Sequence, residues 1–151
     1  MVTAQIERLT DILPELKPLL PMHYEDLSLH RLHGVPLRPQ YHVYLERDAR
    51  GLVCCATLRA NGLIVGYKIG FVAAGLHYET CLTALPDIFF IAHDHRGGTG
   101  ALKLFRCYER ELRRRGVMLW MDGSKDHKST GRLFEALGFV QTETTYSKWL
   151  V

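Results

Sequence analysis

The sequence predicts an α/β fold in which a mixed central sheet is flanked by helices. Three patterns indicate this class: apolar residues at helical spacing near the N-terminus, strands joined by Asn61-Gly62, and a buried run at Leu85–Ala92 followed by glycines and a helix. The chain has 151 residues, of which 47% are hydrophobic and 23% are charged. These values are typical of a globular chain with one core, so residues 1–151 are interpreted as one domain.

The N-terminal segment is predicted to be mostly helical. Apolar residues recur there at helical spacing, at Ile6, Leu9, Ile12, Leu13 and Leu16. Thr3 is a candidate N-cap, and Pro14 and Pro18 are expected to kink or split the helix. Leu19–Leu32 is expected to form a loop and a short second helix.

Three strands are predicted in the middle of the chain. Tyr41–Glu46 is the first, and the turn signal Asp48-Ala-Arg-Gly51 separates it from Leu52–Arg59. Asn61-Gly62 predicts a tight hairpin turn, because both residues tolerate positive φ. Leu63–Val72 is therefore expected to pair with Leu52–Arg59.

The second half predicts alternating strands and helices. Leu85–Ala92 is apolar apart from Asp87, as in a strand buried on both faces. A helix follows and ends at Arg113-Arg114-Arg115 and Gly116, where cations suit the negative end of the macrodipole and glycine suits the C′ position. Val117–Met121 is expected to lie parallel to Leu85–Ala92 after a right-handed crossover.

After Met121, the sequence predicts one more helix and a final hairpin. The helix is expected over Ser129–Leu137, closed by Gly138. Phe139–Thr142 and Thr145–Val151 are expected to form the final pair of strands.

Charge and composition exclude several function classes. The net charge of +3 is too small to indicate nucleic acid, and the arginine run is interpreted as a helix-end feature. Met1–Thr10 lacks the apolar run of a signal peptide, and no stretch approaches the roughly 20 apolar residues of a membrane span. The four cysteines have no zinc or C-x-x-C spacing, which indicates reduced thiols and a cytoplasmic protein. The eight histidines are interpreted as solvated or hydrogen-bonded, with no metal site.

The turn His95–Ala101 joins the buried strand to the start of a helix. A helix start offers free N–H groups and about half a positive charge. The three glycines of the turn let a phosphate approach, while Arg96 adds a charged donor and Thr99 a hydroxyl. The pattern predicts an anion site suited to a diphosphate.

Two common phosphate-binding loops differ from this turn in their spacing. A Walker loop requires Gly-Lys-Ser/Thr, which is absent. A dinucleotide fingerprint requires G-x-G-x-x-G near the start of a Rossmann domain, whereas this motif lies late in the chain and does not match. A helix-starting turn without a ligand is the remaining alternative.

Asp87–Ala92 followed by Arg96–Ala101 resembles motif A of the GCN5-related N-acetyltransferases (GNAT superfamily). That motif reads Arg/Gln-x-x-Gly-x-Gly/Ala at the start of a helix. Arg96 matches its first position and Ala101 its last, whereas Thr99 replaces the inner glycine.

The frame that begins at Arg96 is preferred over a second possible frame. A frame shifted by one residue places Gly98 and Gly100 on both glycines but His95 on the arginine. Leu133–Phe139 resembles the closing segment of the family. Scattered segments are similar to a bacteriophage-encoded branch: Pro18–Glu25, Gly66-Tyr67 and His77-Tyr78.

The resemblance implies a GNAT-like acyl-CoA N-acyltransferase fold and acetyl transfer from acetyl-CoA to an amine, without a covalent enzyme intermediate. The pantetheine arm would pair with the backbone of Ile91 and His93, and the diphosphate would lie on the amides of Gly97 to Ala101. The cofactor-binding residues implied in this way are Ile91, Ala92, His93, Arg96, Gly97, Gly98, Thr99, Gly100 and Ala101.

An amine must lose its proton before it attacks, so a general base is expected. Asp87 is the first candidate, because it interrupts an apolar strand and matches a position where many family members carry a glutamate. The alternative is a solvated residue at the strand start. Glu25 and His23 are rival bases, since the first helical loop of the family often lines the acceptor site. His23, Tyr24, Glu25 and Tyr78 are therefore expected to bind the acceptor.

The leaving thiolate needs a proton. Many family members use a tyrosine in the helix that follows the Val117 strand, but the matching position here is Phe134. Tyr146 is a candidate substitute, and its alternative is a half-buried strand aromatic. Solvent is the other proton source.

The main hypothesis is an acetyl-CoA-dependent N-acetyltransferase acting on a primary amine. The acceptor is left open among a protein lysine or N-terminus, a small polyamine or antibiotic, and an amine-bearing modified base. The alternative is a non-catalytic acyl-CoA-binding or virion-associated phage protein, in the host cytoplasm. A nucleic-acid binder using Arg110 and Arg113–Arg115 is the third hypothesis. No membrane partner is expected. The resemblance implies a possible homodimer, because members of the family often form dimers.

Overall fold

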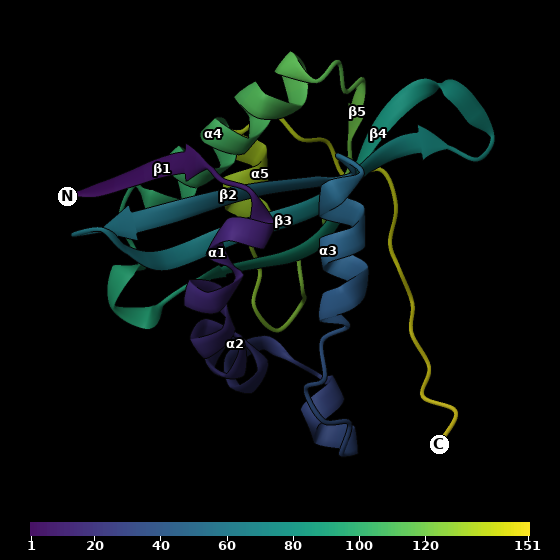
Figure 1. Cartoon of the computed structure of the whole chain (residues 1–151). Helices are drawn as coiled ribbons and strands as arrows, with labels where there is room; N and C mark the ends of the chain where they lie inside the picture. Colours follow the sequence, from purple (N-terminus) through teal and green to yellow (C-terminus); the bar gives the residue numbers. More distant parts are fainter.

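A curved five-stranded sheet forms the centre of the molecule in the computed structural model, which describes all 151 residues. The strand order follows the sequence, and every pairing is antiparallel except the last. The strands are β1 (Val2–Ile6), β2 (Val53–Ala60), β3 (Leu63–Gly75), β4 (Tyr78–Ile91) and β5 (Leu119–Trp120). The predicted mixed sheet flanked by helices is confirmed (Figure 1).

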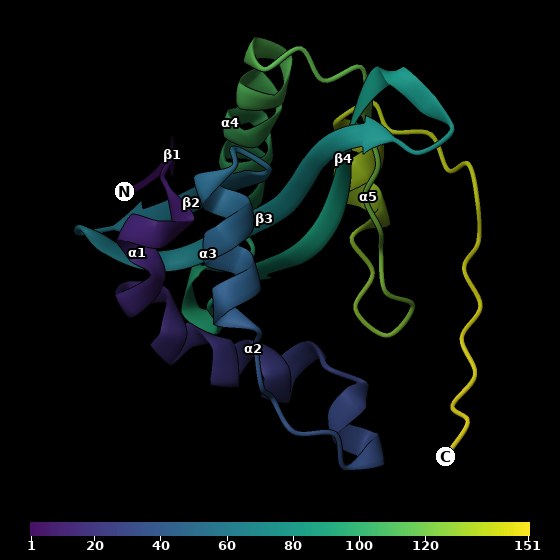
Figure 2. The same cartoon turned by 45° about the vertical axis from the view of Figure 1, so that its right-hand side comes forward.

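Helices cover both faces of the sheet (Figures 1 and 2). One face carries α1 (Leu9–Leu16), α2 (Leu20–Leu27) and α3 (Tyr41–Ala49). The other carries α4 (Gly100–Arg114), and the short α5 (Gly131–Ala136) packs beside it through aromatic contacts. Short 3₁₀ turns lie at Lys17–Leu19, His30–His33 and His93–His95. No helix is both long and apolar enough to cross a membrane.

The core is divided into two layers by the sheet. On the α1 side, Leu9, Leu16 and Tyr67 are fully buried members of one apolar cluster. On the α4 side, Leu104 and Tyr108 belong to the second cluster. Because β2 and β3 separate these clusters, they are buried on both faces and their sequences are apolar almost throughout.

The predicted β2–β3 hairpin is confirmed. Asn61 has φ 50° and Gly62 has φ 81°, the left-handed conformation that a tight hairpin turn requires. The prediction for the end of α4 is also confirmed, because Gly116 follows the helix with φ 79°. The arginine run is engaged within the fold: Arg114 and Arg115 both pair with Glu111.

The middle of β4 contains a β-bulge. Ile88 pairs with Ile69 and Pro86 with Gly70, so Asp87 is an extra residue with no partner on β3. Gly70 is required here, since a Cβ atom would lie 2.2 Å from the Tyr108 hydroxyl oxygen and 2.7 Å from a backbone oxygen. The bulge therefore turns the Asp87 side chain out of the regular alternation of the strand.

β4 and β5 touch only briefly. Their parallel pairing is confined to Thr83 with Leu119 and Ala84 with Trp120. The parallel pair was predicted farther along β4, at Leu85–Ala92, and that placement is wrong. From Leu85 onward the outer edge of β4 has no strand beside it.

Two further predictions of local structure are corrected. Val2–Ile6 is a strand rather than the start of a helix, because alternate residues bury one face against the α4 layer. Tyr41–Ala49 is a helix rather than a strand, since Tyr41, Tyr44 and Leu45 form one apolar face that packs on the α1 layer. The first of these segments alternates with period two and the second with helical period.

The predicted C-terminal hairpin is absent. Residues 140–151 form no strand and no backbone hydrogen bond. The segment is held instead by Trp149, whose ring stacks on His33 with centroids 4.1 Å apart. Its polar stretch offers no apolar face to bury, and β5 is too short to act as a template.

Candidate functional site

A row of free backbone N–H groups lies where β4 leads into α4. None of the amides from Gly97 to Leu102 donates a hydrogen bond to the backbone, and no side chain caps the helix. The first intrahelical bond there is from the Lys103 amide to the Thr99 carbonyl oxygen, 3.0 Å. The loop is exposed on its outer side, so these donors are open to an anionic ligand.

The loop conformation accounts for each glycine that matters. Gly97 has φ 82°, which other residues rarely adopt. At Gly100, a Cβ atom would lie 2.9 Å from a side-chain carbon of Leu58. Thr99 has φ −84°, an ordinary value, so a glycine is unnecessary there. The departure of Thr99 from the family pattern therefore leaves the row of amides intact, and the loop fits a diphosphate.

Arg96 is engaged in contacts within the fold. Its Nε donates to the Ile91 carbonyl oxygen at 2.6 Å, and its guanidinium pairs with Asp26 of α2. Its charge centre also lies over the Phe90 ring at 5.4 Å. Arg96 thus ties the end of β4 to α2, and the main chain supplies the donors for an anion.

The outer edge of β4 is available for pairing beyond Ala84. The Ala92 amide donates to Val65 of β3, so by strand alternation Ile91 and Phe89 direct their backbone groups away from β3. Ile91 was predicted to offer such groups, whereas Phe89 was missed. His93 lies in the 3₁₀ turn after the strand, so its backbone does not continue the edge.

Asp87 lies at the bulge with one clear partner. The Tyr44 hydroxyl of α3 donates to its Oδ2 at 2.5 Å. Burial raises the pKa of the Asp87 carboxyl, although the Tyr44 hydrogen bond and the positive charges of Lys68 and Arg47 act in the opposite direction. A half-buried carboxylate with a raised pKa is suited to accept a proton.

Lys68 crosses beneath β4 to the segment that follows β5. Its Nζ lies 2.7 Å from Oδ2 of Asp122, and both side chains are almost fully buried. The contact is an ion pair only: its geometry is not that of a hydrogen bond, and no other donor reaches this oxygen. Because β4 lies between β3 and β5, the pair ties β3 to the segment beyond β5.

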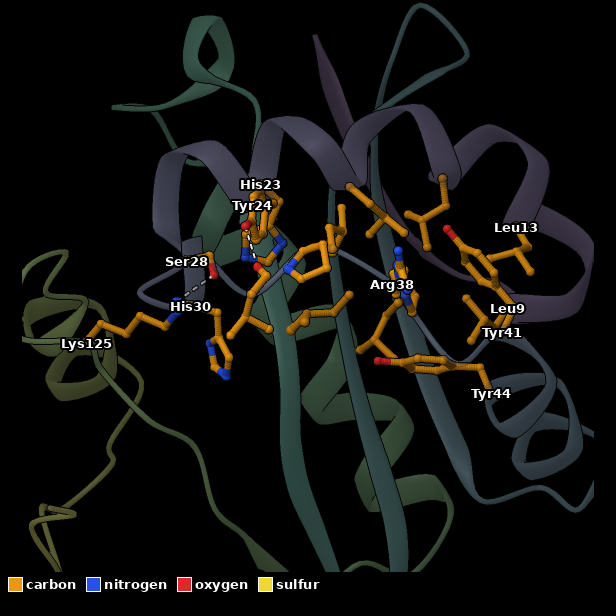
Figure 3. A pocket seen from close by; sticks show the side chains of 18 residues that line it. Leu9, Leu13, His23, Tyr24, Ser28, His30, Arg38, Tyr41, Tyr44 and Lys125 are labelled. Carbon is orange, nitrogen blue, oxygen red and sulfur yellow. Dashed lines mark hydrogen bonds between the residues drawn. The ribbon is translucent and has the colours of Figure 1, made fainter. Parts of the chain in front are cut away.

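A cavity of about 330 Å³, named here the apolar cavity, lies on the α1 side of the sheet beside the bulge (Figure 3). Its floor is formed by leucines of α1 and α2 and by Ile69 and Ile88 of the sheet. Tyr24 donates to the Val35 carbonyl oxygen at 2.5 Å, which attaches the loop over the cavity to α2. Tyr44 lines this cavity and also an adjoining one of about 350 Å³ that contains Asp87.

His23 also lines the apolar cavity. Its Nδ1 is 2.8 Å from the Tyr67 hydroxyl, and its ring stacks on Phe90 with centroids 5.1 Å apart. Burial, followed by the positive charge of Lys125, lowers the pKa of His23 to about 4. The imidazole is therefore neutral near pH 7.

The structure brings only some of the predicted acceptor-side residues together. His23 and Tyr24 line the apolar cavity, and Asp87 lies beside it. Glu25 is on the exposed face of α2 and makes no hydrogen bond, while Tyr78 is 73% exposed at the start of β4. Tyr44 and Arg38 were missed by the sequence reasoning, although the helical spacing of Tyr41, Tyr44 and Leu45 is a signal that could have placed Tyr44.

The proton donor predicted for the thiolate is not at the site. Tyr146 is 90% exposed in the extended C-terminal segment and forms no hydrogen bond. Phe134, at the position where the family resemblance led us to expect a tyrosine, packs in an aromatic cluster with Phe105 and Phe139. Its ring stabilises α5 against α4 and has no proton to give.

Several solved structures resemble this chain along nearly its whole length. A ribosomal-protein-alanine N-acetyltransferase from Brucella melitensis is 19% identical with a TM-score of 0.72, and the match covers 100% of each chain. AAC(6')-Iy in complex with the bisubstrate analogue CoA-S-monomethyl-acetylneamine is 14% identical with a TM-score of 0.73, covering 99% of this chain and 97% of the other. A protein from Clostridium acetobutylicum, described as a predicted acetyltransferase and solved with acetyl-CoA, is 11% identical with a TM-score of 0.70, covering 99% of this chain and 97% of the other.

Neither a protein-family model nor a curated protein sequence matches the chain. At identities of 19% and below, the structural likeness establishes a shared fold. Nothing in it indicates a bacteriophage origin, which stays a prediction. The chain has the fold of the GCN5-related N-acetyltransferases.

Proposed function

We propose that residues 1–151 act as one acetyl-CoA-dependent N-acetyltransferase domain whose acceptor is a primary amine. The observation that carries the proposal is the row of free amides from Gly97 to Leu102 beside an unpaired strand edge. AAC(6')-Iy and the clostridial acetyltransferase share this fold and contain a coenzyme A analogue and acetyl-CoA, respectively. Coenzyme A carries a diphosphate, which suits the free amides from Gly97 to Leu102.

On the cofactor side of the site, the chain would bind and orient acetyl-CoA. The amides of the α4 start would hold the diphosphate, with the positive end of the helix dipole behind them. The backbone groups of Phe89 and the amide of Ile91 would pair with the amide-bearing pantetheine arm, in the manner of an added strand, while the Ile91 carbonyl oxygen already accepts from Arg96. Acetyl-CoA would supply the acetyl group as a thioester.

The acceptor half would prepare the amine. The Asp87 carboxylate takes the proton of the ammonium, directly or through a water molecule, and the neutral nitrogen then forms a bond to the acetyl carbon. The carbon–sulfur bond would break with its electron pair leaving on the thiolate, and the nitrogen would lose its second proton to water to give the neutral amide. Solvent would protonate this thiolate, since Phe134 cannot and Tyr146 is exposed elsewhere.

The test is release of free thiol from acetyl-CoA, measured with the purified protein over a panel of primary amines. The proposal expects amine-dependent thiol release together with one-to-one binding of acetyl-CoA at micromolar concentration. Absence of acetyl-CoA binding would contradict it outright.

A second candidate is a non-catalytic acyl-CoA-binding protein. The observation that favours it is Phe134, which stands at the position expected for the proton donor of the thiolate and instead packs in an aromatic cluster with Phe105 and Phe139. This candidate expects tight binding of acetyl-CoA and no thiol release above background with any amine of the panel.

A further inference from the structure

The apolar cavity has the shape and the lining of a small-molecule site. Its volume of about 330 Å³ is near the lower end of the range for ligand pockets, which is about 300–1,000 Å³. Most of its lining is apolar, and Leu9, Leu13, Tyr41 and Tyr44 lie together at one side of it (Figure 3). An apolar body of amino-acid size would therefore fill it, whereas a large hydrated sugar or a long polyamine would not.

The polar side chains that line this cavity carry positive charge or no charge. No aspartate or glutamate lines it, while Arg38 and Lys125 do. Arg38 lies on the same side as Tyr41 and Tyr44, whereas His30 and Lys125 lie at the far end (Figure 3). Neither Arg38 nor Lys125 takes part in an ion pair of the fold, so no carboxylate oxygen lies within 4.0 Å of either charged group.

The adjoining cavity, which contains Asp87, adds a further cation. Arg38 and Arg47 both line it, and Arg47 lies 4.5 Å above the Phe71 ring without an acidic partner. Its only carboxylate is Asp87, which already accepts from Tyr44. The cavity nearest the proposed base thus carries more positive than negative charge.

This charge distribution selects among amines. Nearby cations disfavour a second ammonium group on the substrate and favour the neutral form of the reacting nitrogen. Arg38 lines both cavities and has no acidic partner, so its guanidinium can form a two-pronged hydrogen bond with a carboxylate. A polycationic aminoglycoside or polyamine requires negative charge at its binding site, whereas these cavities carry mostly positive charge.

Building on the proposed function, we infer that the acceptor is a small monoamine with an apolar body and one carboxylate, bound with the body in the apolar cavity and the carboxylate on Arg38. The amine then points past Tyr44 toward Asp87. An aromatic or branched amino acid has this chemistry.

Equilibrium binding tests the inference without requiring turnover. Calorimetry with protein saturated with coenzyme A would compare N-acetylphenylalanine with N-acetylphenylalaninamide, which differ only in the carboxylate. We expect the carboxylate to bind about tenfold more tightly and Arg38→Gln to remove the difference. Arg106→Gln, on the exposed side of α4, is the matched control and should preserve it. Equal binding of the two probes by the native protein would overturn the inference.

Turnover separates this inference from the proposed function. With acetyl-CoA, phenylalanine should show a higher kcat/KM than phenylalaninamide or spermidine, and Arg38→Gln should lower only the value for phenylalanine. Preference for spermidine would overturn the inference while supporting acetyl transfer. Selective binding of the carboxylate probe with no turnover of any amine would support the inference and contradict the proposed function.

Discussion

The two halves of the site are built from different chemical groups of the chain. On the cofactor side, the donors are backbone groups: the amides of Gly97 to Leu102 and the open edge of β4. On the acceptor side, the groups are side chains from separate elements, such as Arg38 of the loop before α3, Tyr44 of α3 and Asp87 of β4. The first half is thus fixed by main-chain conformation, and the second by tertiary packing.

This difference predicts opposite sensitivities to substitution. Side chains can change in the cofactor half as long as the amides and the glycine conformations remain. In the acceptor half, one altered side chain removes a catalytic or binding group, because each group occurs once. The following substitutions test the contrast, from the largest expected effect to the smallest.

Asp87→Asn should lower kcat by about 10²-fold or more, since a positioned general base contributes on the order of 10²–10⁴. Binding of acetyl-CoA should be unchanged, because Asp87 belongs to the acceptor half. Thiol-release assays and calorimetry measure the two effects. Glu25→Gln is the control, as Glu25 is exposed on α2, and it should retain full activity. Equal losses in both variants would contradict the assignment.

His23→Gln should change how stability depends on pH. The folded pKa of His23 is about 4, below its ordinary value of 6.5, so the unfolded chain binds a proton first. The native protein should therefore lose about 3 kcal/mol as pH falls from about 7 to about 4, with little further loss from this group below that.

Urea unfolding at pH 7 and about pH 4.5 measures the effect of His23. Glutamine can keep a hydrogen bond to Tyr67 but does not titrate, so the variant should show a smaller decrease in the free energy of unfolding. A native protein and variant with parallel pH profiles would show that His23 is solvated rather than buried against Phe90.

Ala101→Pro should weaken acetyl-CoA binding by about tenfold, the loss of about one hydrogen bond to a charged group. Proline is tolerated in the first turn of a helix, and it removes one N–H that α4 does not use. Thr99→Ala keeps every amide and should bind within about twofold of native protein by calorimetry. A larger loss of acetyl-CoA affinity for Thr99→Ala than for Ala101→Pro would indicate that the Thr99 hydroxyl binds the cofactor instead.

Tyr44→Phe should shift the acidic limb of the pH–rate profile to higher pH. The Tyr44 hydroxyl stabilises the Asp87 carboxylate, so its removal raises the pKa of Asp87 further above the ordinary value. A higher pH is then needed to keep the base ionised. An unmoved limb would indicate that another group sets it.

The same contrast decides what could be predicted from the sequence. The strand, the loop and α4 were predictable, because glycines and a helix start specify local conformation over few residues. Tyr44 was not, since its helix was mistaken for a strand and its partner Asp87 lies 43 positions away. The bulge that exposes Asp87 depends on Gly70 and Tyr108, which no local pattern connects.

The C-terminal hairpin failed for a related reason. The hairpin was predicted over Phe139–Val151, but a strand forms only where an edge accepts it. β5 offers two residues for pairing, and Trp149 packs on His33 instead.

The central claim is that main-chain amides at the start of α4 hold the cofactor, and a backbone NMR titration tests it most directly. Adding acetyl-CoA to ¹⁵N-labelled protein should produce its largest amide shifts at Gly97 to Leu102 and along β4 at Phe89 and Ile91. Saturation should occur at micromolar ligand. An unchanged spectrum, or shifts confined to the cavity beneath α1 and α2, would contradict the account.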